Sequence, residues 1–390
     1  MTESRGNIFF DNAAGSQLPA RVIDAVKDHL VHRMVVWGLR DVELVAVDTD
    51  PDRLAFSPIR RRIRIGRSHV PGPHPMSAPE VSHRAVEESR NRVAEALAGS
   101  DMVFIVAGMG DSTGTGAAPL IAKIALEAGA LTVGLVTEPL DTEGPVRIQS
   151  AEAGIEGMKK WVNTLIRVPL QRLNAFRFQE VGLRRPGFLI RGTPNPILKE
   201  ILGLAEDLVV RVTQGICDSI LLPGLICIDF NDVKLPFLSG KEALVGTGGA
   251  EGTDRGVLAA RRALASPLMK RGIWGAGGVL VHISAGDGLN LFEVNDAVSV
   301  IRDAVGSEDD VLWSAPDGED SGDELRVTVI ATGFTNTGEA AEAEPPVDRT
   351  EEAFDTGPLS PDSLEYPTFL RKRRGLYHSR RTEEVGLEPG

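Results

Sequence analysis

The chain has 390 residues, of which 42% are hydrophobic and 25% charged, and its formal net charge is −13. This composition is typical of a soluble protein with one large core or two medium ones, and the acidic balance argues against general nucleic-acid binding, which needs an excess of Lys and Arg. The only two cysteines, Cys217 and Cys227, exclude a disulfide framework, so we expect buried thiols in a cytoplasmic protein. Neither a signal peptide nor a transmembrane segment is expected.

The first half alternates short β-rich runs with helical patterns, which predicts a parallel sheet covered by helices. The predicted strands are Asn7–Phe10, Glu43–Val47, Met102–Ala107 and Leu131–Thr137. Between the last two strands, AAPLIAKIALEAG places apolar residues at helical spacing and ends at Gly129, which predicts one βαβ unit.

A long helical stretch, PNPILKEILGLAEDLVVRVTQGI, opens at Pro194 or Pro196 and is predicted to run between two lobes. After it come three strand-like runs, GLICIDF, GGVLVHISAG and DELRVTVIATG, and one helical pattern, FEVNDAVSVIRDAVG. This order predicts a second, smaller α+β lobe.

Beyond Gly333 the composition turns acidic and proline-rich, which predicts a disordered linker. It ends in LEYPTFLRKRR, where Tyr366, Phe369 and Leu370 precede a basic run that begins at Arg371. Such a segment is typical of a short peptide that folds on a partner, assisted by anionic lipid. A solvated charged end is the alternative.

The stretch VAGMGDSTGTGAAP follows an apolar run and opens a helical pattern. Backbone N–H groups and the helix dipole can bind an anion at such a place, and glycines let the backbone approach it closely. The absence of a following Lys excludes a P-loop, and the acid of a dinucleotide fingerprint is also missing. The stretch therefore predicts a phosphate site, with a bare turn as the alternative.

The region DMVFIVAGMGDSTGTGAAPLIAKIALEAGALTVGLVTEPLDTEG resembles the tubulin-signature region of FtsZ, the bacterial cell-division GTPase family. Further similar stretches are VAVDTD, IRIG, GLICIDFNDV, GTGGAEGTDR, SPLM and DELRVTVIATG. The resemblance implies an α/β fold, in which a Rossmann-like parallel-sheet GTPase domain (42–212, with the central helix) joins an α+β domain (213–335). It also implies a disordered acidic linker (336–364) and a binding peptide (365–381).

Family roles fall on particular residues. Through the resemblance, the nucleotide GTP or GDP, with Mg²⁺, is expected to contact Gly108, Gly110, Thr113, Gly114, Thr115, Gly116, Glu143 and Arg147, with Asp207 beside Glu206 at the guanine. Asp111 and Ser112 replace two family glycines, and a carboxylate beside phosphates is electrostatically unfavourable unless a metal bridges them or the side chain turns outward.

The resemblance also implies that hydrolysis needs a second copy of the chain. The loop Cys227–Asp232 keeps two acids, Asp229 and Asp232, which in this family enter the neighbour's nucleotide pocket and orient the attacking water. The alternative is that they only cap the following helix. The implied assembly is a head-to-tail homopolymer at the cytoplasmic division ring, with membrane-tethering adaptors on Tyr366, Phe369, Leu370 and Arg371.

Three segments depart from the family pattern. Residues 1–41 diverge, and FFDNAAGSQLPARVIDAVKDHL resembles instead the start of class V pyridoxal-phosphate enzymes. The Phe9–Gln17 loop keeps only Gly15 of the family's glycine cluster, and prolines enter the glycine-rich loop at Pro71–Ser77. The residues 174–191 replace a shorter connection. A second hypothesis follows, in which the chain is a degenerate FtsZ-like subunit that joins or caps filaments of an intact FtsZ without hydrolysing GTP.

Overall fold

The computed structural model of the chain describes residues 6–10, 42–66, 79–176, 196–226, 228–269, 272–286, 289–307, 311–316 and 323–334. The predicted linker and C-terminal peptide lie outside these residues, as do Cys227 and the Pro71–Ser77 loop. Within the described part, no helix combines the length and the apolar character that crossing a membrane requires.

A parallel sheet forms the first lobe. Its hydrogen-bonded order is β3 (Arg61–Arg64), β2 (Val42–Asp48), β1 (Gly6–Phe10), β4 (Met102–Gly108), β5 (Leu131–Glu138) and β6 (Thr164–Pro169). Every residue of β4 is buried, as expected for a central strand of a parallel sheet covered on both faces. The four predicted strands are confirmed, each to within one residue at either end.

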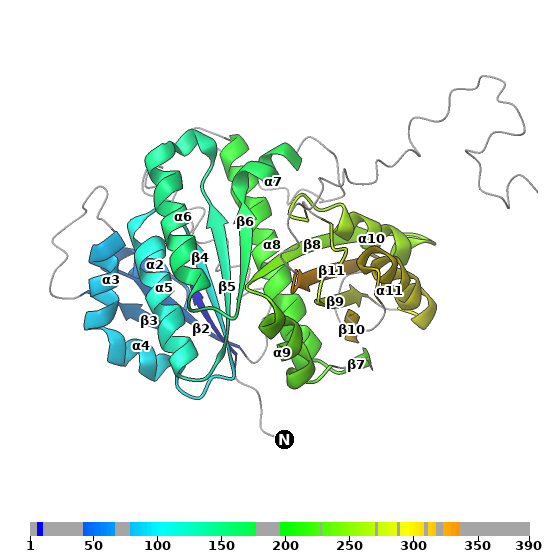
Figure 1. Cartoon of the computed structure of the whole chain (residues 1–390), viewed down its shortest axis with the longest axis horizontal. Coiled ribbons are helices and arrows are strands. Elements are labelled where there is room, and N and C mark those ends of the chain that lie inside the picture. Colours follow the sequence, from blue (N-terminus) through cyan, green and yellow to red (C-terminus); the bar gives the residue numbers. More distant parts are fainter. Residues whose placement is uncertain are drawn as a thin grey trace, which may run out of the picture. The chain divides into compact units, whose positions relative to one another are not determined.

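Helices cover both faces of this sheet (Figure 1). On one face, α3 (Pro79–Glu88), α4 (Arg90–Leu97), α5 (Ser112–Glu127) and α6 (Pro145–Lys159) share a core with Val103 and Ile105 of β4. On the other face, α2 (Pro51–Phe56), α7 (Leu170–Phe176) and α8 (Pro196–Leu221) share a core with Phe104 and Val106. The alternation along β4 follows from the two-residue period of a strand.

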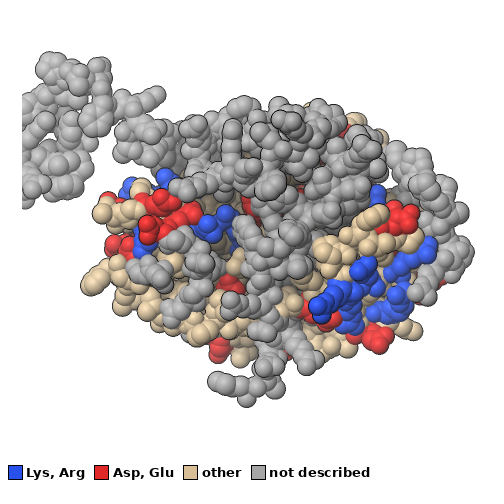
Figure 2. Space-filling view, turned by 180° about the vertical axis from the view of Figure 1, so that it is seen from behind, with Lys and Arg blue, Asp and Glu red and all other residues tan. Residues whose placement is uncertain are grey.

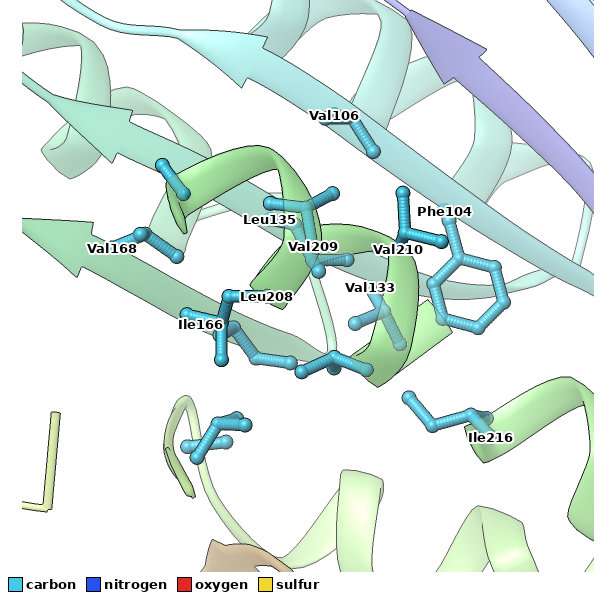
Figure 3. Close-up of a cluster of buried hydrophobic side chains, with 14 of the residues drawn as sticks. Phe104, Val106, Val133, Leu135, Ile166, Val168, Leu208, Val209, Val210 and Ile216 are labelled. Atoms are coloured by element: carbon cyan, nitrogen blue, oxygen red, sulfur yellow. The ribbon is translucent and has the colours of Figure 1, made fainter. Parts of the chain in front are cut away.

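The long central helix is confirmed as α8, which begins at Pro196 and continues to Leu221. Leu208, Val209 and Val210 of α8 lie against the apolar side chains of β4, β5 and β6 (Figure 3). Cys217 is buried on the same helix, as predicted, and burial together with the adjacent Asp218 carboxylate raises the pKa of its thiol.

The second lobe continues the sheet from β6 with β8 (Glu242–Ala250), β11 (Leu325–Thr332), β9 (Gly278–Ala285), β10 (Val311–Pro316) and β7 (Gly224–Ile226). Two helices, α10 (Arg255–Leu264) and α11 (Leu291–Val305), complete its core. The predicted α+β lobe is therefore confirmed. The GLICIDF strand is wrong in its second half, because Asp229 caps α9 (Phe230–Ser239) and Phe230 is helical.

Lys and Arg side chains gather on the face that Figure 2 shows, on the side of the first lobe, although the chain is acidic overall. The arginines of β3 have hydrogen-bond and ion-pair partners on neighbouring elements. Arg61 pairs with Glu43 at 2.7 Å, and Arg62 donates to the carbonyl oxygen of Leu54 at the end of α2 at 3.0 Å. These guanidinium groups thus bind neighbouring elements of the same lobe.

Candidate functional site

The glycine-rich segment connects the carboxyl end of β4 to the start of α5. Within it, the Met109 N–H donates to the Thr137 carbonyl at 3.0 Å, and the Gly110 N–H donates to Thr115 Oγ1 at 2.9 Å. The Asp111 carboxylate accepts from the Gly114 N–H at 3.0 Å and so provides the N-cap of α5. These bonds close a turn of only three residues, 109–111.

The resemblance implied a phosphate loop that runs to Gly116, but Thr113, Gly114, Thr115 and Gly116 are helical. All four are buried in the first turns of α5, because the Asp111 cap starts the helix at Ser112. Gly116 serves helix packing: a Cβ there would lie 2.1 Å from the Pro79 carbonyl oxygen of α3. Thr113, Gly114 and Thr115 still place the amino end of α5 next to the turn.

Glu143 and Arg147 are brought to this turn by the connection after β5. Glu143 closes the short helix η1 (Asp141–Glu143), where its Oε1 accepts from the Leu140 N–H at 2.8 Å. Arg147 Nε lies 3.0 Å from Glu143 Oε2. Gly110 has φ = +102°, and a Cβ on it would lie 2.8 Å from Arg147 Cγ, so the glycine lets the arginine pack on the turn.

The end of β2 supplies residues that the sequence analysis missed. Thr49 Oγ1 lies 3.3 Å from Thr113 Oγ1, which joins β2 to the start of α5. Arg53 on α2 lies 3.9 Å from the buried Asp48 and 3.4 Å from Asp50. The signal was available, because VAVDTD stands at the carboxyl end of a predicted strand and parallel strands bring such ends to one edge.

Asp111 is the carboxylate most affected by this arrangement. Burial raises its pKa from 3.8 to about 6, although the Gly114 N–H and the positive charge of Arg147 act in the opposite direction. Asp48 raises the pKa further and Arg53 lowers it. The edge of the sheet therefore holds a polar, charged site in which one carboxylate titrates near neutral pH.

The predicted guanine contact, Asp207, lies on α8 beside the buried Glu206. The next residues, Leu208 and Val209, pack on the sheet face formed by β4, β5 and β6 (Figure 3). Both acids also take part in interactions within the chain. The binding roles of Asp207, Glu143 and Arg147 stay predictions.

Asp229 and Asp232 lie at the other end of the strands, where β6 begins, opposite to the carboxyl ends that carry the glycine turn. Thr164, the first residue of β6, donates to the carbonyl oxygens of Phe237 at 2.6 Å and Gly240 at 2.9 Å, which fixes α9 where β6 begins. Because β4, β5 and β6 are parallel and Thr164 is level with Phe104, the end of β4 at Gly108 lies about 13 Å further along the strands, and the glycine turn lies beyond it. Figure 1 shows α9 at the end from which β5 starts.

Both acids of α9 are exposed, and Asp229 accepts from the N–H groups of Asn231 at 2.7 Å and Asp232 at 3.0 Å. The capping alternative is thus correct for the local geometry of Asp229. It does not exclude a second role, since a carboxylate on a free surface can also meet another molecule. In the described structure, neither acid reaches the glycine turn of its own chain.

Two family models match the chain. The tubulin/FtsZ family GTPase domain matches residues 13–177, and the FtsZ family C-terminal domain matches residues 241–335. The first match begins inside the segment predicted to diverge, and the resemblance of that segment to pyridoxal-phosphate enzymes stays an expectation.

Solved structures of similar fold include proteins of M. jannaschii and Haloferax volcanii. An empty FtsZ dimer of M. jannaschii is 28% identical, with 87% of this chain and 91% of that chain covered and a TM-score of 0.72. CetZ2 of Haloferax volcanii, in a GTPγS-bound protofilament, is 20% identical over 85% of this chain and 94% of that chain, with a TM-score of 0.65. GDP-bound CetZ1 of the same organism is also 20% identical, over 86% and 95%, with a TM-score of 0.66.

Proposed function

The chain belongs to the tubulin/FtsZ family, and on that premise we propose that it binds GTP at the carboxyl edge of its parallel sheet and polymerises head to tail. Hydrolysis then occurs between subunits. The observation that carries this proposal is the separation of the glycine turn from Asp229 and Asp232, which lie at opposite edges of one sheet. A carboxylate that cannot reach the phosphates of its own chain can act only on those of a neighbour.

At the phosphate end, the amino terminus of α5 offers N–H groups and the positive end of the helix dipole. Gly110 allows close approach of the backbone, and Arg147 adds a guanidinium beside it. Asp111 fits a phosphate site poorly, because its carboxylate already accepts the Gly114 N–H at the start of α5. Mg²⁺, when bound with the nucleotide, would neutralise part of the phosphate charge.

At the other end, Asp232 stands in the first turn of α9 with its carboxylate exposed. Docked on the glycine turn of a second copy, a carboxylate there orients and polarises the attacking water and accepts its proton. Asp229 starts the helix and so fixes the position from which Asp232 projects. Turnover per subunit is therefore expected to rise with protein concentration across the assembly range.

Mixing two inactive variants tests whether the nucleotide pocket of one subunit works with the acids of its neighbour. Asp232→Ala keeps a working pocket, and Gly110→Val, which forces a side chain onto Arg147, keeps working acids. Each variant alone should release no phosphate, whereas an equal mixture should recover about one quarter of wild-type turnover, since random heterologous contacts pair a sound pocket with sound acids that often. No recovery, in a mixture that sediments as joint filaments and retains GTP, would refute the proposal.

A second candidate function is that of a subunit that joins or caps filaments of an intact FtsZ without turnover. Asp111 favours it, because its carboxylate occupies the helix end that a phosphate needs. Calorimetry with GTP and Mg²⁺ separates the two candidates. Absent binding together with co-sedimentation on FtsZ filaments identifies the second, and saturable binding with phosphate release identifies the first.

We also propose that the filaments act at a cytoplasmic division ring, and that the tail residues Tyr366, Phe369, Leu370 and Arg371 bind a membrane-tethering adaptor. The sequence supports this, because aromatic residues followed by a basic run are typical of a short peptide that binds a partner. Deletion of Tyr366–Arg374 should abolish membrane recruitment and leave assembly unchanged. Equal recruitment with and without the peptide contradicts the role of the tail.

A further inference from the structure

We propose that Asp111 is an internal competitor of the nucleotide phosphate and makes nucleotide affinity depend on pH. The inference rests on the proposed function, because it concerns the same site. Its geometric basis is the hydrogen bond from the Gly114 N–H to the Asp111 carboxylate at 3.0 Å, at the helix end where a phosphate would bind.

Two other donors of the turn are already used. The Met109 N–H is used by the Thr137 carbonyl, and the Gly110 N–H is used by the Thr115 hydroxyl. An incoming phosphate that needs the Gly114 N–H must therefore displace the Asp111 carboxylate. An ionised carboxylate left beside the phosphate repels it, and this repulsion is strong where water is largely excluded.

The charges that face Asp111 come from several elements. Among the described residues, Asp48 at the end of β2 is negative, while Arg53 on α2 and Arg147 on α6 are positive. Arg147 also pairs with Glu143 of η1, which partly neutralises it. The site therefore has no large surplus of positive charge, and the protonation state of Asp111 decides how strongly an anion is held.

The direction of the pH effect follows from the pKa. Burial raises the pKa of Asp111 to about 6, and a phosphate bound nearby would raise it further, so binding takes up a proton above that pH. Affinity should fall by up to about tenfold per pH unit as the pH rises above 6. Below 6 the carboxyl group is mostly neutral, and the effect of its charge on affinity should vanish.

The test measures GDP binding to the full chain by calorimetry from pH 5.5 to 8.5 at constant Mg²⁺, in the wild type and in Asp111→Asn. Asparagine keeps the N-cap but cannot ionise, so the variant stays folded and reports the titration of the nucleotide itself. We expect equal affinities at pH 5.5 and binding at least about tenfold tighter in the variant at pH 8. Asp111→Gly should also bind more tightly at pH 8.

Glu95→Gln is the matched control, because it removes one exposed carboxylate from α4 and should not change the pH profile. Identical profiles for wild type and Asp111→Asn overturn this inference and leave the proposed function standing. Tighter binding by the wild type at pH 8 also overturns it. Absence of GDP binding in every protein at every pH refutes the proposed function and this inference together.

Discussion

Two helices of this protein begin in the same way at opposite edges of one sheet. An aspartate caps each of them: Asp111 accepts from the Gly114 N–H at α5, and Asp229 accepts from the N–H groups of Asn231 and Asp232 at α9. Asp111 is half-buried near Asp48, Arg53 and Arg147, whereas Asp229 is exposed. The same local device therefore yields a carboxylate that competes for an internal site and one that is available to a second molecule.

The difference arises from what packs around each cap. The start of α5 packs against the ends of β2 and β4 and against Arg147, so the Asp111 carboxylate is partly buried and its charged form is disfavoured. The start of α9 faces solvent, where a carboxylate is well hydrated. Substitutions at four residues test how far this contrast extends.

The largest effect is expected from Asp232→Ala. If the acids of α9 serve a neighbour, turnover falls at least about 100-fold, the usual contribution of a general base. Nucleotide binding by the unassembled protein should not change, because Asp232 is remote from its own glycine turn. Phosphate release and GDP titration on the same preparation measure both quantities. Weaker nucleotide binding by the variant would indicate that Asp232 belongs to the nucleotide site of its own chain.

Gly110→Ala should lower the free energy of unfolding by about 1–3 kcal/mol and weaken nucleotide binding, because φ = +102° is strained for alanine and the new Cβ meets Arg147. Gly252→Ala is a matched control: its φ is +95°, but nothing lies within 4 Å of the added Cβ. Both variants carry backbone strain, but only Gly110→Ala adds steric overlap, so the difference in their free energies of unfolding, measured by urea denaturation, reports the overlap. Equal losses would show that Arg147 moves aside without cost.

Asp111→Asn should stabilise the protein at pH 8 by about 1–2 kcal/mol and have little effect at pH 4. The folded pKa, about 6, is higher than the ordinary 3.8, so the folded state binds the proton more tightly and loses stability as the pH rises between these values. Urea denaturation of both proteins at the two pH values measures the difference. A stability difference that is equal at pH 4 and pH 8 contradicts the raised pKa.

The smallest effect is expected from substitutions of Asp229, which test its role as helix cap apart from its proposed role in turnover. Asp229→Ala removes the cap of α9 and should cost about 1 kcal/mol, whereas Asp229→Asn retains the cap and should cost little. Both variants should lose turnover if the charge acts on a neighbour. Full turnover in Asp229→Asn, measured beside its denaturation midpoint, would leave capping as the whole function of this residue.

The sequence was sufficient to predict the parallel sheet, since apolar runs such as Met102–Ala107 are typical of strands buried on both faces. It was insufficient for the start of α5, because Thr113 and Gly114 have low helix propensity, and the Asp111 cap together with burial against β4 and α3 makes them helical. Asp48 could have been predicted, because VAVDTD ends a predicted strand, whereas the approach of Arg53 depends on how α2 packs beside it, which local patterns do not encode.

The placement of the glycine turn and α9 on opposite edges also has a consequence for long assemblies. A contact that joins unlike faces leaves one of each face uncovered, so a filament has two chemically different ends. In the proposed head-to-tail filament, the terminal subunit whose glycine turn is uncovered would receive no carboxylates from a neighbour, and it should keep its nucleotide intact after the interior has reacted. Growth and shrinkage would then differ between the ends, and a filament's direction would follow from the order of strands within a single subunit.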